Sequence, residues 1–125
     1  AGATLTTVTV FGGYVEVQSN VTTATVRDGE LVVEAAATVT TLDVGVLDVR
    51  SDARPTCRYN SSGTLTTANV RRRGFLDLMQ DLRSKTITTC NLFAGSRLDY
   101  LEAVVTVTPT LSAGATPDEV EINRG

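Results

Sequence analysis

The two cysteines, Cys57 and Cys90, carry the most reactive side chains in this sequence. Each lies in a threonine-flanked segment that is typical of a β-strand. The chain has no histidine, and two thiolates alone could not complete a zinc shell. We therefore predict a disulfide between Cys57 and Cys90, which favours an extracellular location because disulfides persist in oxidising compartments. Two buried free thiols are the alternative.

Catalytic machinery is not evident in the sequence. The absence of histidine removes the commonest general base and the serine–histidine–aspartate triad. The sequence contains no phosphate-binding loop, dinucleotide glycine fingerprint or nucleophile elbow. We predict a protein that is not an enzyme and that has no cofactor.

Acidic side chains offer the remaining route to a site. Asp43, Asp48 and Asp52 could approach one another at a bend of the chain and bind a calcium ion through oxygen ligands. Their spacing does not place them together on one strand face, and we favour solvated charges on a β edge. Asn20 and Asn60 begin N-X-S/T triplets, which arise by chance in a chain rich in threonine and serine, so glycosylation stays open.

Arginines are concentrated in one part of the chain. Arg50, Arg54 and Arg58 precede the triplet Arg71, Arg72 and Arg73. Guanidinium groups form bidentate hydrogen bonds with sulfate, phosphate or carboxylate groups. The patch could therefore bind such an anion or the acidic surface of a neighbour, while ordinary surface ion pairs are the simpler interpretation. We take Arg71, Arg72 and Arg73 as candidates for salt bridges between subunits.

Composition limits the possible partners. The formal net charge is −3, whereas a nucleic-acid-binding protein needs a basic surface, so we predict no nucleic acid binding. No apolar run approaches the roughly 20 residues that span a bilayer, so we predict no membrane span. Threonine and valine are abundant and favour strands. We predict one domain over residues 1–125.

Local patterns then predict the elements. Gly12-Gly13 and Asp28-Gly29 are typical of tight hairpin turns, and apolar residues in 74–83 follow the spacing of a short helix. We found no internal repeat, and residues 110–125 read as an extended C-terminal tail. The expected fold is all-β and mainly antiparallel with one short helix, as a two-sheet sandwich or flattened barrel of roughly eight short strands.

The N-terminal segment suggests a function. Residues 1–10 carry no charge, although an exposed edge strand is usually protected by charge or proline. Residues 1–10 could therefore be an exchanged or donated strand, with Thr4, Leu5, Val8 and Val10 as candidate subunit contacts. We predict a structural subunit that self-assembles through β edges and terminal arms into an extracellular filament, a pilus-like fibre or a virion shell. The alternative is a monomeric secreted β-sandwich that binds a protein or glycan, and any host or surface receptor stays unknown.

Overall fold

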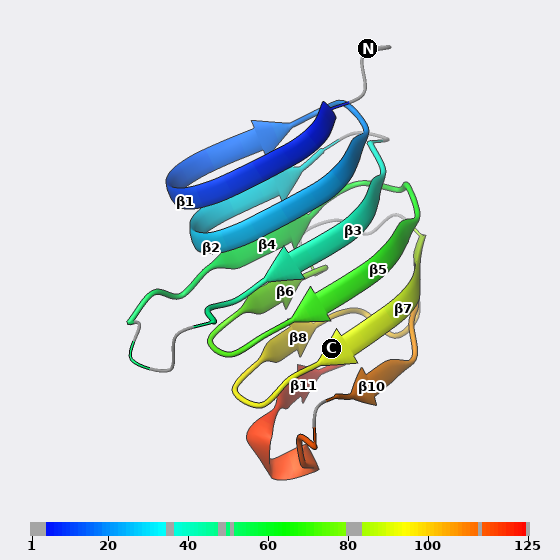
Figure 1. Cartoon of the computed structure of the whole chain (residues 1–125). Coiled ribbons are helices and arrows are strands. Elements are labelled where there is room, and N and C mark those ends of the chain that lie inside the picture. The colour runs from blue at the N-terminus through cyan, green and yellow to red at the C-terminus, as the bar shows by residue number, and fades with distance from the viewer. Residues whose placement is uncertain are drawn as a thin grey trace.

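The computed structural model describes residues 5–34, 37–47, 50, 52–79, 84–112 and 114–124. In this part the chain winds in successive coils, each stacked on the one before (Figure 1). Every strand pair is parallel. The fold is a parallel β-solenoid, so the expected antiparallel sandwich or barrel is wrong.

The described residues form eleven strands and one short 3-10 turn. These elements are β1 (Leu5–Val17), β2 (Val21–Val33), β3 (Val39–Val44), β4 (Thr56–Tyr59), β5 (Leu65–Val70), β6 (Phe75–Asp77), β7 (Lys85–Leu92), β8 (Arg97–Asp99), β9 (Val105–Thr106), β10 (Pro109–Leu111), η1 (Pro117–Glu119) and β11 (Glu121–Asn123).

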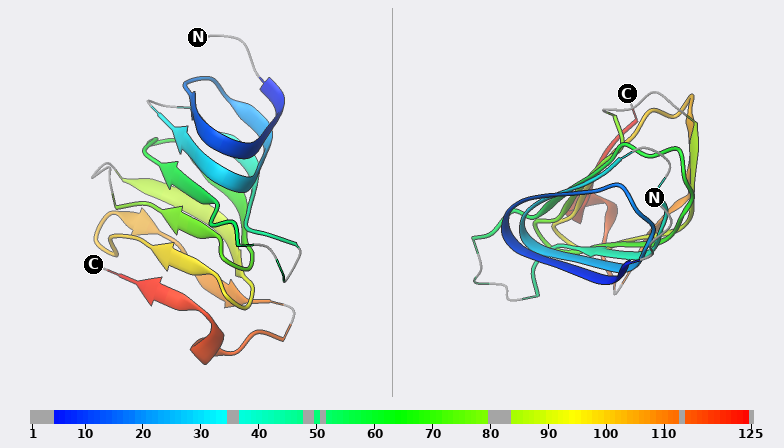
Figure 2. Two further views of the ribbon diagram at one scale, coloured as in Figure 1. Left: turned by 90° about the vertical axis from the view of Figure 1, so that its left-hand side faces the viewer. Right: turned by 90° about the horizontal axis from the view of Figure 1, so that it is seen from above.

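The strands stack in two columns because each coil bends at a corner. The first half of β2 pairs with β3 and its second half with β4. From β2 onward one stack continues through β3, β5, β7 and β10, and the other through β4, β6, β8 and β11. We call them the first and the second stack, and the two halves of β1 begin them. Viewed along the axis, the coils form a flattened ring (Figure 2).

A six-residue repeat builds the first stack. Its pattern is an aliphatic residue, two threonines, two variable residues and a second aliphatic residue, and it occurs at residues 5–10, 21–26, 39–44, 65–70 and 87–92. Copies in neighbouring coils pair in register at five of the six positions, as Val39 with Leu65 and Val44 with Val70. The interval ranges from 16 residues between Leu5 and Val21 to 26 between Val39 and Leu65. The expectation of no repeat is therefore wrong.

Inward side chains fill the coils with stacked columns. One column of the second stack runs through Leu31, Cys57, Leu76 and Leu98, all fully buried. In the first stack the final aliphatic residue of each repeat is buried: Val10, Val26, Val44, Val70 and Leu92. Burial of each such side chain contributes about 1.5–3 kcal/mol. This core fixes which side chains point outward.

The expected hairpins are corners within strands. Gly13 and Gly29 have φ angles of 74° and 79°, which glycine adopts without steric cost. A Cβ atom at Gly29 would lie 2.5 Å from the Gly13 carbonyl oxygen. The glycines therefore let successive coils bend and stack closely, and the chain keeps its direction around the coil instead of reversing.

The expected helix over 74–83 is also wrong. Phe75–Asp77 is strand β6, and Leu76 and Leu78 are both fully buried. The inward period is therefore two, which the nearby apolar residues Phe75 and Met79 obscure in the sequence. Residues 80–83 lie outside the described part of the chain.

Candidate functional site

The two cysteines lie in strands, as expected, but they do not form a disulfide. Cys57 in β4 pairs with Leu31 and Leu76, whereas Cys90 in β7 pairs with Ala68 and Pro109. They belong to different stacks, so the predicted bridge is wrong. Burial raises the pKa of Cys90 to about 12 and that of Cys57 further still. Both thiols are unreactive core residues, and the argument from a disulfide for an extracellular location no longer holds.

Asp43 is held in an ion-pair network instead of a metal site. Its Oδ1 atom lies 2.8 Å from Arg27 Nη1 and 2.9 Å from Arg71 Nε. Arg71 also lies over the Phe93 ring, 4.5 Å from its centroid. Among the described residues no three metal-ligating side chains come together, and Asp48 lies outside them. The network crosslinks three coils at one corner.

The three arginines of the triplet lie in different surroundings. Arg71 faces Asp43, whereas Arg73 donates a hydrogen bond from Nε to the Ala53 carbonyl at 3.1 Å. Arg72 is exposed, and its side chain lies close to Gly95. The triplet forms the corner between β5 and β6, so it does not present three guanidinium groups to one partner surface.

The predicted N-terminal contacts differ in exposure. Leu5 is 41% exposed, Val8 is half-buried and Val10 is buried. Thr4 lies outside the described residues. In the described part of the chain β1 pairs with β2 on one side only, so its outer edge is open. Two large side chains beyond the predicted set, Phe11 and Tyr14, are 75% and 60% exposed on the same strand.

The first stack also carries a surface that was not predicted from the sequence. The paired threonines of the repeat make up a surface that we call the threonine face. Its first column consists of the first threonine of each repeat: Thr6, Thr22, Thr40, Thr66 and Thr88. Its second column consists of the second threonines, which pair in register from coil to coil: Thr7, Thr23, Thr41, Thr67 and Thr89. All members of the first column are exposed. The recurring Thr-Thr pair was the signal that could have revealed it.

The hydroxyl groups of the threonine face are available to a ligand. None of these ten side chains forms a hydrogen bond with another described protein group. Adjacent strands place equivalent residues about 4.7–4.9 Å apart. The face is therefore a periodic array of hydroxyl and methyl groups on a rigid, buried backing.

Comparison with protein family models, with curated proteins and with solved structures finds no match to this chain. No helix in the described part is long and apolar enough to cross a membrane.

Proposed function

We propose that this chain is a non-enzymatic structural subunit that joins a second copy of itself through the open edge of β1. The observation that supports the proposal is the edge itself: a 13-residue strand with no described partner on its outer side. Its first charged residue is Glu16. Unpaired backbone groups along such a strand are a template for another strand.

A second copy of β1 suits this edge better than the opposite end of the solenoid does. The last coil offers only β10 and β11, each three residues long, and β10 begins with Pro109, which has no N–H to donate. Pairing of β1 with β1 requires a two-fold axis, which uses the same surface on both copies. Such joined pairs would be the units of a larger filament or shell.

The exposed side chains on β1 support the same arrangement. Leu5, Phe11 and Tyr14 would lose exposed apolar surface if a second copy covered the end of the solenoid. Burial of apolar area stabilises association at roughly 25 cal/mol per Å² before the costs of ordering are subtracted. No charge from the first ten residues opposes the approach.

The test is the mass in solution of the protein and of two matched variants. Thr7→Lys combined with Thr9→Lys adds charge to the edge strand, and we expect it to shift the mass from a dimer or larger species to a monomer of 13.2 kDa. Thr23→Lys combined with Thr25→Lys adds the same charge one strand away and should leave assembly intact. A wild-type monomer at all concentrations in light scattering would contradict the proposal.

The threonine face favours a second function, adsorption to a lattice of ordered water such as ice. Tetrahedral hydrogen bonding with oxygens about 2.75 Å apart places second-neighbour water oxygens about 4.5 Å apart. This spacing is close to the strand spacing of about 4.7–4.9 Å that separates paired threonines in the second column. A rigid array of unpartnered hydroxyls can therefore match many lattice positions at once.

This second function is tested by capture of the protein into slowly grown ice. Thr40→Tyr combined with Thr66→Tyr would lift the lattice away from the face, and we expect capture to fall to the level of an unrelated protein. Glu16→Tyr places the same ring on the second stack, away from the face, and should leave capture unchanged. Binding to insoluble cellulose without capture in ice would show that the face binds a polymer instead.

A further inference from the structure

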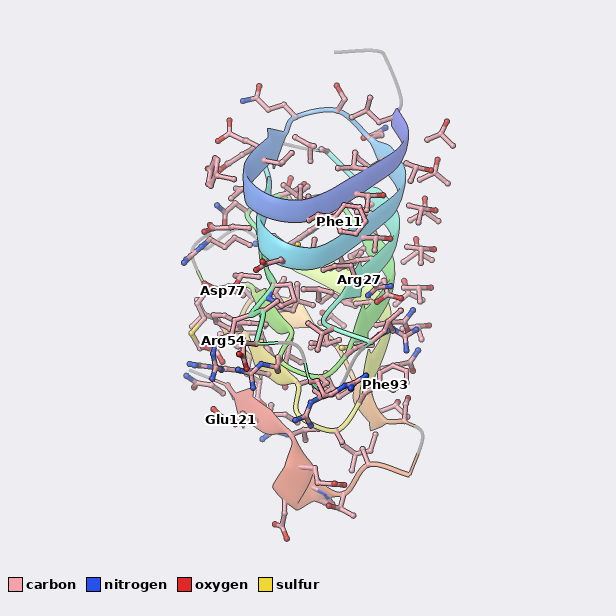
Figure 3. All side chains as sticks on the ribbon, turned by 60° about the vertical axis from the view of Figure 1, so that its left-hand side comes forward. Phe11, Arg27, Arg54, Asp77, Phe93 and Glu121 are labelled. Atoms are coloured by element: carbon pink, nitrogen blue, oxygen red, sulfur yellow. The ribbon has the colours of Figure 1, made fainter. Side chains whose placement is uncertain are left out.

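A basic groove crosses the corner where four strands of the second stack begin. It has a volume of about 280 Å³ and is lined by Arg54, Thr56, Arg73, Gly74, Phe75, Gly95, Ser96, Arg97 and Glu121. We call it the arginine groove. Figure 3 shows side-chain nitrogen atoms gathered between the labelled residues Arg54 and Glu121, on the side of the molecule away from Phe93.

Three guanidinium groups line the arginine groove, and only part of their hydrogen-bonding capacity is used. Arg73 donates from Nε to the Ala53 carbonyl, which leaves its two terminal nitrogens. Arg97 donates from Nε and Nη2 to Asp99 and lies 4.6 Å from the Phe75 ring centroid, so its position is fixed. Arg54 forms no side-chain hydrogen bond or ion pair with any other described residue. The groove therefore holds donors without enough acceptors.

The acidic side chains near the arginine groove pair with only one of its three arginines. Asp99 is committed to Arg97, and Glu121 is 79% exposed at the rim, 3.9 Å from Arg97 Nε. Asp28, Glu30 and Asp52 line the adjacent hollow, which shares Arg54 and Thr56 with the groove. Glu30 is paired with Arg58 at 2.6 Å. Among the described residues neither Arg54 nor Arg73 has an ion-pair partner, so these two guanidinium groups keep their charge unpaired in the groove.

Ser96 supplies a separate indication that the groove receives an acceptor. Ser96 is only 2% exposed, and its buried hydroxyl oxygen has no hydrogen-bond partner. An unsatisfied buried hydroxyl destabilises a fold, so such a group calls for a partner, often an ion or a water. A bound oxyanion would accept a hydrogen bond from it.

The backbone conformation of Arg73 also supports a role for its side chain in the groove. Among the described residues Arg73 alone combines a side chain with a positive φ angle, 62°. This conformation is costly for any residue other than glycine and asparagine. A glycine would fit the corner without strain, whereas the arginine at this position carries a backbone cost.

We propose that the arginine groove is a binding site for a tetrahedral oxyanion, phosphate or sulfate, held by Arg54, Arg73 and Arg97 with Ser96 as a hydroxyl donor. Charge-assisted hydrogen bonds from guanidinium groups suit the several oxygens of such an anion. The anion is either a free ion or the same group carried on a polymer, since the groove is open to solvent.

Calorimetric titration with inorganic phosphate, inorganic sulfate and dextran sulfate tests the proposal, at constant ionic strength with chloride as the control anion. We expect saturable binding that Arg54→Gln and Ser96→Ala each weaken about tenfold. Arg124→Gln removes the same charge outside the groove and should leave binding unchanged. Binding of dextran sulfate alone, weakened by the same two variants, would identify a polymer as the source of the anion.

A stability measurement separates this role from a purely structural one. Without phosphate or sulfate, Ser96→Ala should unfold at the same temperature as the wild type or higher, because it removes an unsatisfied hydroxyl. Added phosphate should raise the unfolding temperature of the wild type more than that of Ser96→Ala. Absence of saturable binding to all three ligands, or equal weakening by Arg124→Gln, would overturn the proposal. Neither result depends on the oligomeric state of the protein.

Discussion

The two ends of the described solenoid are built differently. At one end β1 is long, free of charge until Glu16 and open along its outer edge. At the other end β10 and β11 are short and joined by a chain segment with a 3-10 turn and two acidic residues, Asp118 and Glu119. Terminal coils of repeat proteins need a polar outer face to stay soluble. One end of the described solenoid therefore presents a long, uncharged strand edge, and the other presents two short strands flanked by charge.

The test with the largest expected effect compares two truncations of apolar side chains, one in the middle of the solenoid and one at its open end. Leu42 is fully buried between Ala24 and Ala68 in the middle of the first stack, so we expect Leu42→Ala to lower the free energy of unfolding by about 2–5 kcal/mol. Val8→Ala, at the half-buried open end, should cost less than about 1 kcal/mol in the monomer. Denaturant titration measures both. Equal losses would show that the open end is packed as tightly as the middle.

A second test uses alkaline pH. Burial raises the pKa of Cys90 to about 12 and that of Tyr59 also to about 12, above their ordinary values. The unfolded chain therefore loses these protons first, and the free energy of unfolding should fall between about pH 9 and pH 12, by at most about 1.4 kcal/mol per pH unit for each group. Urea titrations at a series of pH values would show it.

The matched variant for the alkaline test is Cys90→Ala. Removing the thiol should make the decline shallower between pH 9 and pH 10, before Tyr59 contributes. A native thiol at Cys57 or Cys90 that reacts with Ellman's reagent at pH 8 as fast as in denaturant would contradict the burial on which this expectation depends.

The smallest expected effect concerns the end formed by β10 and β11. The Glu119 carboxylate accepts hydrogen bonds from the Thr116 backbone N–H at 2.8 Å and from its hydroxyl at 3.1 Å. Glu119→Ala should therefore lower the free energy of unfolding by about 0.5–1 kcal/mol. Thermal unfolding at low protein concentration measures it, and Glu102→Ala, another exposed carboxylate, serves as the control. A change in assembly by Glu119→Ala would show that this end also joins copies.

The strand content could be predicted from the sequence, but the topology could not. Alternation of apolar and polar residues, as along Leu65–Val70, is the same for parallel and antiparallel strands. Gly12-Gly13 and Asp28-Gly29 have the composition of reversing turns. Gly13 and Gly29 do adopt positive φ angles, but at corners where the chain bends without reversing. A chain reversal at these glycines would break the alignment of one repeat with the next. Recognition of the repeat would therefore have favoured parallel strands over hairpins.

Unequal spacing hid the repeat and hence the threonine face. A fixed period is the usual sign of a solenoid, but here the interval changes from coil to coil. The arginine patch was recognised in the sequence, whereas its division into an ion pair at Arg71 and a groove at Arg73 depends on the corner between β5 and β6. Ser96 carried no sequence signal, since its importance comes from burial alone.

The segment between β3 and β4 has a consequence for how this protein can change over evolutionary time. Eleven residues separate the end of β3 from the start of β4, the longest connection between the two stacks. Of these, the structure describes residues 45–47, 50 and 52–55, and the coloured part of this segment extends outside the ring seen along the axis (Figure 2). The repeats on either side, Val21 with Val39 and Val39 with Leu65, nevertheless keep their register. Sequence can thus be added at a corner without disturbing the coils above and below. That corner is where a lineage of this protein could acquire a new recognition loop, or where an engineer could insert one.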